Sequence, residues 1–274
     1  MAIKLSELAL PSVSPEGMKA LGIISAVDPD TKELEKTILH DPVLAGTLIK
    51  YANSPLYRRP NKITSVPAAM RTLGHKNIRS AVVMATMRSA IESDNPVNRL
   101  IWDHCMEIAV ICKLIAQKIC AELTDEMEFL GLIHEMGMLV LANNYPDEYS
   151  DIIATSIENR QAIDQLEEAR LEIQHDAVMT RISEKFRLPE SYAQILGTYH
   201  KHQAIDAIET EQQRMLCILD LAHHLWFETD TSHKQYLETI VEPRDKLLRL
   251  LQLDEEAIQQ IINECLTLVA STPQ

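Results

Sequence analysis

The sequence predicts an all-α fold, a multi-helix bundle, and three properties of its composition indicate this class. Hydrophobic residues make up 46% of the 274 residues, enough for a sizeable core, whereas aromatic residues make up only 4%. The chain has only 7 glycines, and hairpin turns between strands depend on glycine because its φ can be positive. Residues that favour helices, such as Leu, Ala, Glu and Gln, are abundant. We therefore expect helices packed around an aliphatic core.

Capping residues and prolines predict the helices of the N-terminal third. Ser14 with Pro15, and Asp41 with Pro42, each combine an N-cap residue with a proline at the first helical position. Gly74 is typical of a helix end, where a positive φ is needed. The helices predicted in this part span residues 15–27, 31–40, 42–54, 68–74 and 77–91.

Asn53 and Ser54 end the third of these helices and have two interpretations. As structure, the pair stops the helix, because Asn tolerates the left-handed conformation and Pro55 prevents continuation. As function, the pair contacts a ligand or a partner at the helix end. We favour the structural interpretation.

The segment SDNPVN at 93–98 is the predicted boundary within the chain, because it combines turn-forming residues with a proline. It separates an N-terminal helical part, residues 1–95, from a second helical part, residues 96–274, and we expect the two to form one compact unit. The helices predicted beyond the boundary span residues 99–121, 126–143, 163–186 (as one helix or two), 189–200, 211–226 and 254–269.

The net charge of −14 disfavours binding to nucleic acid, because phosphates would be repelled. One local exception is a basic cluster in the N-terminal part. We expect an ordinary solvated surface there, the alternative being a patch that binds an anion or nucleic acid. Its members are Lys50, Arg58, Arg59, Lys62, Arg71, Lys76, Arg79 and Arg88.

The cysteines and the N-terminus predict a cytoplasmic protein. The five cysteines form no CxxC pair, so we expect reduced, buried thiols. Residues 1–17 lack the pattern of a secretory signal. No apolar run is long enough to span a membrane, so we expect no membrane association.

Four metal-binding side chains interrupt the apolar faces of three predicted helices. Imidazole and carboxylate groups suit Zn, Fe, Mn or Ni better than Ca. Such a metal could polarise a phosphoryl oxygen and activate a bound water. The alternative is that each is an ordinary hydrogen-bonded core residue, in which case Asp220 pairs with a histidine, or caps or bridges helices. The four candidates are His104, His134, Glu135 and Asp220.

Other histidines receive weaker assignments. His175 and His200 lie on further predicted helices and are candidates for a second metal, for a supporting position or for phosphate binding. We expect His223, His224 and His233 at the surface, without a role.

Two motifs resemble known families. The segment GLIHEMG at 131–137, with His104 before it and Asp220 after it, resembles the H…HD…D pattern of the HD superfamily of metal-dependent phosphohydrolases. The segments HDPVLAGTLIKYANSPLY at 40–57 and ITSVPAAMRTLGHKNIR at 63–79 are similar to the signature of the HDOD family. The resemblance covers about residues 5–225. The matching residues are Asp41, Pro42, Leu44, Ala52, Asn53, Ser54, Tyr57, Ile63, Ser65, Ala69, Leu73, Gly74 and Arg79.

The HDOD resemblance implies an N-terminal helical portion packed on a degraded HD-like bundle, in a bacterial regulatory output domain. It also implies that most members of the family no longer have a complete set of metal ligands. Glu135 stands where an HD enzyme has Asp, and its extra methylene moves the oxygens by roughly 1.5 Å. Metal binding is thereby weakened rather than excluded. No lysine or arginine adjoins this pair, and Lys113 and Lys118 lie on the preceding predicted helix.

Two functions follow from these observations. The first is a non-catalytic regulatory or signalling module that binds a protein or a nucleotide messenger. The second is a metal-dependent phosphohydrolase of a nucleotide or phosphoester, in which Glu135 and a metal-bound water would carry the reaction. A metal-binding sensor without hydrolysis is a third alternative.

Overall fold

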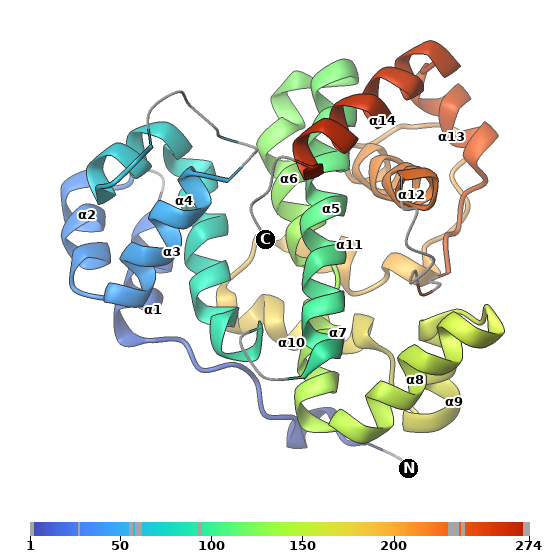
Figure 1. Cartoon of the computed structure of the whole chain (residues 1–274), viewed down its shortest axis with the longest axis horizontal. Helices are drawn as coiled ribbons and strands as arrows, with labels where there is room; N and C mark the ends of the chain where they lie inside the picture. Colours follow the sequence, from blue (N-terminus) through green and yellow to red (C-terminus); the bar gives the residue numbers. More distant parts are fainter. Residues whose placement is uncertain are drawn as a thin grey trace. The chain divides into compact units, whose positions relative to one another are not determined.

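The computed structural model describes residues 3–26, 28–54, 57, 62–91, 95–229, 236 and 239–270. Every regular element among these residues is a helix, so the predicted all-α class is confirmed (Figure 1). The chain forms two compact units. One contains Pro11–Glu92 and Thr267–Gln274, and the other contains Met1–Leu10 and Ser93–Leu266. The division at residues 95 and 96 stays a prediction.

The unit containing residues 11–92 is built on capped helices. Ser14 Oγ accepts a hydrogen bond from Gly17 N at 3.0 Å, and Asp41 Oδ1 accepts one from Val43 N at 2.9 Å. Ser14 Oγ also donates to Asp41 Oδ2 at 2.6 Å, which joins two helix starts. The helices are α1 (Pro15–Ile24), α2 (Thr31–Leu39), α3 (Pro42–Ala52) and α4 (Val66–Ile91).

A kink at Gly74 divides α4, and its cause is the backbone conformation there. Gly74 has φ 70° and ψ 172°, a combination that a residue with a Cβ adopts only with strain. The break predicted at this glycine is therefore present, although the helix resumes directly beyond it. The first predicted helix ends earlier than expected, at Ile24; its predicted last residue, Val27, lies outside the described residues.

Asn53 has a structural role. Its side-chain amide donates to Ile49 O and to Ile63 O, both at 2.8 Å, and its Oδ1 accepts from Ile63 N at 2.9 Å. These bonds tie the end of α3 to the segment before α4. The expected left-handed conformation is wrong, because Asn53 has φ −98°. The side chain, rather than an unusual backbone, holds the chain here.

Part of the basic cluster is described. Lys50, Lys62 and Arg71 are exposed, in agreement with a solvated surface. Arg58 and Arg59 lie outside the described residues, as do the side chains of Lys76 and Arg88 and the whole of His233.

The other unit, which includes residues 93–266, is a bundle that contains most of the described helices. Within it α5 packs against α6 and α12, and α7 packs against α10 (Figure 1). Its elements are η1 (Leu5–Glu7), α5 (Pro96–Ile119), η3 (Ala121–Leu123), α6 (Thr124–Ile133), α7 (Met136–Asn144), α8 (Pro146–Asn159), α9 (Ile163–Leu171), α10 (His175–Phe186), α11 (Glu190–Leu196), η4 (Tyr199–Lys201), α12 (Glu211–Thr229), α13 (Arg244–Leu251) and α14 (Glu255–Ala270), the last of which runs beyond the end of the unit.

One sequence prediction in this unit is corrected, and two helices are added to it. The single helix expected over 126–143 is two helices, because the backbone leaves the helical path at Glu135. Helices α8 and α13 were not predicted. Both present an apolar stripe to the core, with Tyr149 and Ile152 buried on α8 and Leu247 buried on α13.

The N-terminal segment 3–10 docks on this unit through hydrogen bonds. Ala9 N donates to Asn144 Oδ1 at 2.9 Å, and Asn144 Nδ2 donates back to Ala9 O at 3.0 Å. Ile3 N donates to Leu171 O at 3.1 Å, and the Arg181 guanidinium donates to Leu5 O. Hydrogen bonds between residues far apart in the sequence thus hold segment 3–10 against the rest of the unit.

Two further findings concern the cysteines and the apolar character of the helices. All five cysteines are free thiols, four of them buried and Cys120 half-buried. None of the described helices combines the length and the apolar character that crossing a membrane requires.

Candidate metal centre

The junction between α6 and α7 positions the His134–Glu135 pair. Glu135 has φ −103° and ψ 18°, in the sparsely populated region where many active-site residues lie. His134 Nδ1 donates to Gly131 O at 2.7 Å, which leaves its Nε2 for another partner. The polar pair thus occupies the break between two helices instead of the side of one.

Three histidines converge beside this junction. His104 on α5, His134 and His223 on α12 bring their ligand nitrogens within 4.8 Å of one another. His134 Nε2 lies 3.2 Å from the Nε2 atoms of both His104 and His223. Around a tetrahedral ion with metal–nitrogen bonds of about 2.0–2.1 Å, neighbouring nitrogens lie roughly 3.3–3.4 Å apart. The spacing therefore fits three ligands of one metal.

The hydrogen bonds behind two of these rings favour the same conclusion. His223 Nδ1 donates to Leu219 O at 2.9 Å, just as His134 Nδ1 donates to Gly131 O. In their neutral forms both rings therefore turn a lone pair at Nε2 toward the other ring. Two acceptors 3.2 Å apart repel each other, whereas a shared cation would attract both.

Aromatic side chains surround the three histidines. The Trp226 ring lies edge-on to His104 with centroids 4.2 Å apart, and the Tyr236 ring lies 5.2 Å from His104. The Tyr199 hydroxyl is 2.9 Å from His223 Nδ1. All three aromatic rings are buried, so the imidazoles sit in apolar surroundings.

A second set of ligands lies on the other side of Glu135. His175, the first residue of α10, places Nε2 at 2.9 Å from Glu135 Oε2. His200, in η4, places Nε2 at 3.6 Å from Glu135 Oε1. The ligand atoms of these three residues also lie within 4.8 Å of one another. Two imidazoles and one carboxylate are a set that non-haem Fe(II) favours.

Carboxylates orient both histidines of this second set. Glu167 Oε2 accepts from His175 Nδ1 at 2.6 Å and from His175 N at 2.9 Å. Asp176 Oδ1 accepts from His200 Nδ1 at 2.9 Å. Such contacts fix which ring nitrogen faces the metal, and they accompany most metal-binding histidines.

These charges shift the proton affinity of the groups involved. Burial alone would lower the pKa of His175, but the Glu135 and Glu167 carboxylates outweigh it and raise that pKa well above its usual value. Burial would raise the pKa of Asp176, yet its hydrogen bond and charge interaction with His200 lower it. The Glu135 and Glu167 carboxylates thus favour the cationic form of His175.

Glu135 lies between the two ligand sets. Its Oε1 is 3.7 Å from His134 Nε2, while its Oε2 contacts His175. Gly137 makes this arrangement possible, because a Cβ there would collide with the backbone carbonyl of His175. The glycine after the His–Glu pair therefore brings α7 and α10 close enough to share the centre.

Asp220 belongs to a different network. Its Oδ2 accepts from His202 Nε2 and from Glu242 N, each at 3.1 Å. Its Oδ1 is buried and has no hydrogen-bond partner among the described residues. Burial would lower the pKa of His202, but the hydrogen bond to Asp220 raises it overall. The structure thus pairs Asp220 with a histidine, as the alternative interpretation anticipated, and places it in neither ligand set.

On α12, the residue that lies beside His104 and His134 is His223. The expectation of a surface position for His223 is wrong, because the side chain is 1% exposed and contacts His134. Asp220 and His223 are three residues apart on α12, so they face the same side of the helix. His224 differs: its Nε2 donates to Glu242 O at 2.9 Å. Two adjacent histidines suggest a solvated helix surface, so this pair gave no indication that His223 is buried.

The two lysines of α5 are engaged elsewhere. Lys113 Nζ donates to Glu128 Oε2 at 2.8 Å in a buried ion pair, and Lys118 Nζ donates to Gln260 Oε1 at 2.9 Å. Neither contact directs a cation toward the ligand sets.

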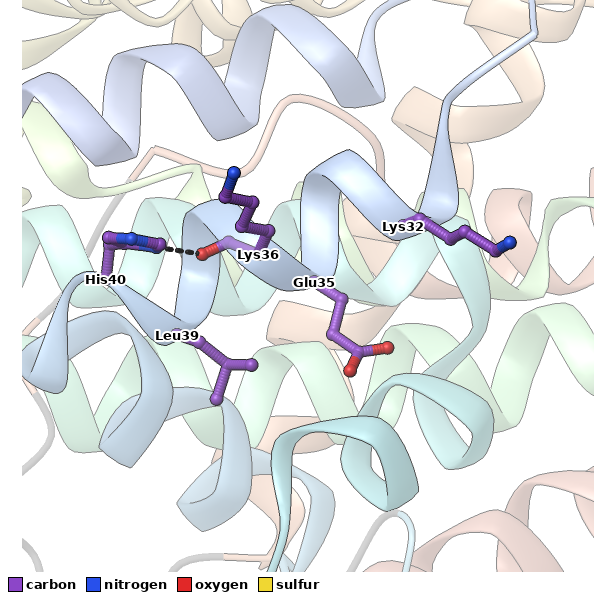
Figure 2. Close-up of a pocket in the computed structure, with 5 residues that line it drawn as sticks. All are labelled: Lys32, Glu35, Lys36, Leu39 and His40. Carbon is purple, nitrogen blue, oxygen red and sulfur yellow. Dashed lines mark hydrogen bonds between the residues drawn. The ribbon is translucent and has the colours of Figure 1, made fainter.

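Two surface pockets lie apart from the ligands. One, of about 220 Å³, is on α2 and is lined by Lys32, Glu35, Lys36, Leu39 and His40 (Figure 2). The other, of about 460 Å³, is lined by Leu10, Arg181, Glu184 and Lys185. Both are open to solvent, and neither includes one of the six ligands.

Comparisons with known proteins agree with the fold. The family model of the HDOD domain matches residues 10–202. No curated protein sequence matches the chain. A solved HDOD domain protein of unknown function from Geobacter sulfurreducens is 22% identical, with a TM-score of 0.68 over 97% of this chain and 90% of that one.

Two other solved structures share this fold. A "Putative signal transduction protein" from Marinobacter aquaeolei VT8 is 19% identical, with a TM-score of 0.74 over 95% of this chain and 58% of that one. A "Putative metal-dependent phosphohydrolase" from Shewanella amazonensis SB2B is 16% identical, with a TM-score of 0.62 over 97% and 95% of the two chains. At these identities the similarity establishes the fold alone.

Proposed function

This chain belongs to the HDOD domain family, and from that premise we propose that it is a regulatory module with a two-metal centre in its helical core. The module acts by binding a protein or a nucleotide messenger, and the centre supports the conformation that binds. Membership of the family and the likeness to a protein named for signal transduction support a regulatory role.

The burial of the centre is the observation that carries this proposal. The six ligand side chains are between 0% and 4% exposed. A phosphoester must reach the metal to be hydrolysed, and substrate sites are concave and open to the ligand. The surface pockets on α2 and beside Arg181 include none of the six residues. A closed centre suits a structural or sensing role better than turnover.

The residues present fit two divalent metal ions. His104, His134 and His223 would hold one ion. Glu135, His175 and His200 would hold the other, and each of these two histidines is oriented by a carboxylate. A bound divalent ion would supply positive charge and Lewis acidity. The protein's own contribution is to fix the imidazoles and to balance the buried carboxylates.

A second candidate function is metal-dependent phosphohydrolysis. The specific observation in its favour is the completeness of the donor set, five imidazoles and a carboxylate that lies between the two groups. The likeness to a protein named as a metal-dependent phosphohydrolase agrees with it. In this case Glu135 would position the reacting groups, and an opening motion would admit the substrate.

The test combines metal content with a search for turnover. The untagged full chain is purified, its metals are measured by mass spectrometry, and p-nitrophenyl phosphates, nucleotides and cyclic dinucleotides are assayed with added Mn or Fe. We expect bound metal and no hydrolysis above that of His134→Ala. Metal-dependent turnover that His134→Ala abolishes would replace the proposal with the second candidate. A metal-free chain would refute the centre.

A further inference from the structure

The two ligand sets differ in the chemistry of their donor atoms. His104, His134 and His223 offer three imidazole nitrogens, and the structure adds no carboxylate from α12, because His202 and Glu242 N hold Asp220. We call these three residues the trihistidine half. The other set, which we call the glutamate half, offers two imidazole nitrogens and a carboxylate oxygen.

Glu135 belongs to the glutamate half by distance. Its Oε2 is 2.9 Å from His175 Nε2, whereas its Oε1 is 3.7 Å from His134 Nε2. The carboxylate therefore contacts one half directly and only approaches the other. This unequal reach gives the two halves different formal charges.

The groups behind the ligands increase that difference. In the trihistidine half, the carbonyls of Gly131 and Leu219 accept from the Nδ1 atoms of His134 and His223, so the partners are uncharged. In the glutamate half, the partners are the Glu167 and Asp176 carboxylates. Carboxylate partners make an imidazole a more basic ligand. The carboxylates of Glu135, Glu167 and Asp176 thus make their close contacts with the glutamate half.

These differences predict different metals. Three neutral imidazoles in a tetrahedral spacing suit Zn(II), which needs no further anionic ligand. Harder divalent ions favour carboxylates, and two imidazoles with one carboxylate are characteristic of Fe(II). Building on the proposed metal centre, we propose that the halves select different ions: Zn(II) on the trihistidine half and Fe(II) or Mn(II) on the glutamate half.

The experiment compares matched variants, one in each half. The full untagged chain is produced with equal supplies of Zn, Fe and Mn, purified without oxygen and analysed for metals. We expect the wild type to contain Zn together with Fe or Mn. His223→Ala should lose mainly Zn, and His175→Ala should lose mainly Fe or Mn. The same element in both halves, or an equal loss of both elements from each variant, would overturn the proposal.

Two milder variants guard against misfolding. Asp176→Asn keeps the shape of the side chain behind His200 and should lower Fe or Mn retention by about 10–100-fold while leaving Zn bound. His223→Asp adds a carboxylate to the trihistidine half and should lower the ratio of Zn to Fe and Mn. Unchanged ratios in both variants, with circular dichroism showing folded protein, would also overturn the proposal. Absence of metal from the wild type would instead refute the proposed centre.

Discussion

Glu135 Oε2 lies 2.9 Å from His175 Nε2, across the contact between the start of α7 and the start of α10. The contact depends on Gly137, since any Cβ at that position would collide with the His175 carbonyl. A residue without a role in binding thus determines whether two ligands meet. The first prediction tests this dependence.

Gly137→Ala should destabilise the fold and empty the glutamate half. Forcing α10 away from α7 costs about 1–3 kcal/mol, the range for overpacked cores. Urea unfolding measures the loss, and metal analysis measures the displaced ligands. The matched control is Gly46→Ala on the exposed side of α3, where a Cβ meets no atom within 4 Å. It should stabilise by about 0.5–1 kcal/mol. Equal effects at the two positions would contradict the argument.

Asp220→Ala should separate stability from metal binding. The substitution removes the carboxylate that accepts hydrogen bonds from His202 and from Glu242 N. Leaving these donors unsatisfied should lower the free energy of unfolding by about 1–3 kcal/mol. Its metal content should match the wild type, whereas His223→Ala, one turn further along α12, should lose metal. Thermal unfolding and metal analysis of both variants supply the readouts. Metal loss in Asp220→Ala equal to that in His223→Ala would return Asp220 to the set of ligands.

Lys113→Ala should be strongly destabilising because Glu128 would remain buried without its lysine. Breaking a buried ion pair on one side costs about 3–5 kcal/mol. The double variant Lys113→Met with Glu128→Leu should recover most of the loss. Lys4→Ala, which removes one partner of an exposed pair with Glu7, is the control and should change stability by at most about 1 kcal/mol. Urea denaturation measures the free energy of unfolding of each variant. A mild effect of Lys113→Ala would show that water hydrates the Lys113–Glu128 pair.

Asn53→Ala should loosen the connection between α3 and α4. Three hydrogen bonds to Ile49 and Ile63 are lost, and leaving the backbone groups unsatisfied should cost about 1–3 kcal/mol. Amide hydrogen exchange should show faster exchange at Ile63. Asn263→Ala, on the exposed side of α14, is the control and should change little. If Asn53→Ala left the exchange rate and stability unchanged but abolished partner binding, the functional interpretation of this residue would be right.

The helices were the predictable part of this structure because their signals are local. Ser14 and Asp41 cap the helices that begin at Pro15 and Pro42, and Gly74 marks the kink in α4. Caps and a glycine with positive φ act within a few residues, so a pattern in the sequence reveals them. The break at Glu135 has no such local signal, and the His134–Glu135 pair there contacts residues from α5, α10 and α12.

The candidate metal centre was predictable only in part for the same reason. His104, His134 and Glu135 interrupt apolar helix faces, and His175 and His200 were recognised as further candidates. The buried position of His223 depends on the register of α12 against α5, which no local pattern supplies. An inward position for His223 could have been noticed from Leu219 and Trp226, its buried neighbours at helical spacing.

The segment 3–10 has a consequence for how the protein is made. Ile3 bonds to Leu171, Ala9 bonds to Asn144, and Arg181 bonds to Leu5. During synthesis, segment 3–10 and residues 11–92, which make up most of the other unit, are all translated before these partners. Closing such long-range contacts late carries the entropic cost of a large loop. Segment 3–10 therefore cannot complete its hydrogen bonds until α10 has been translated.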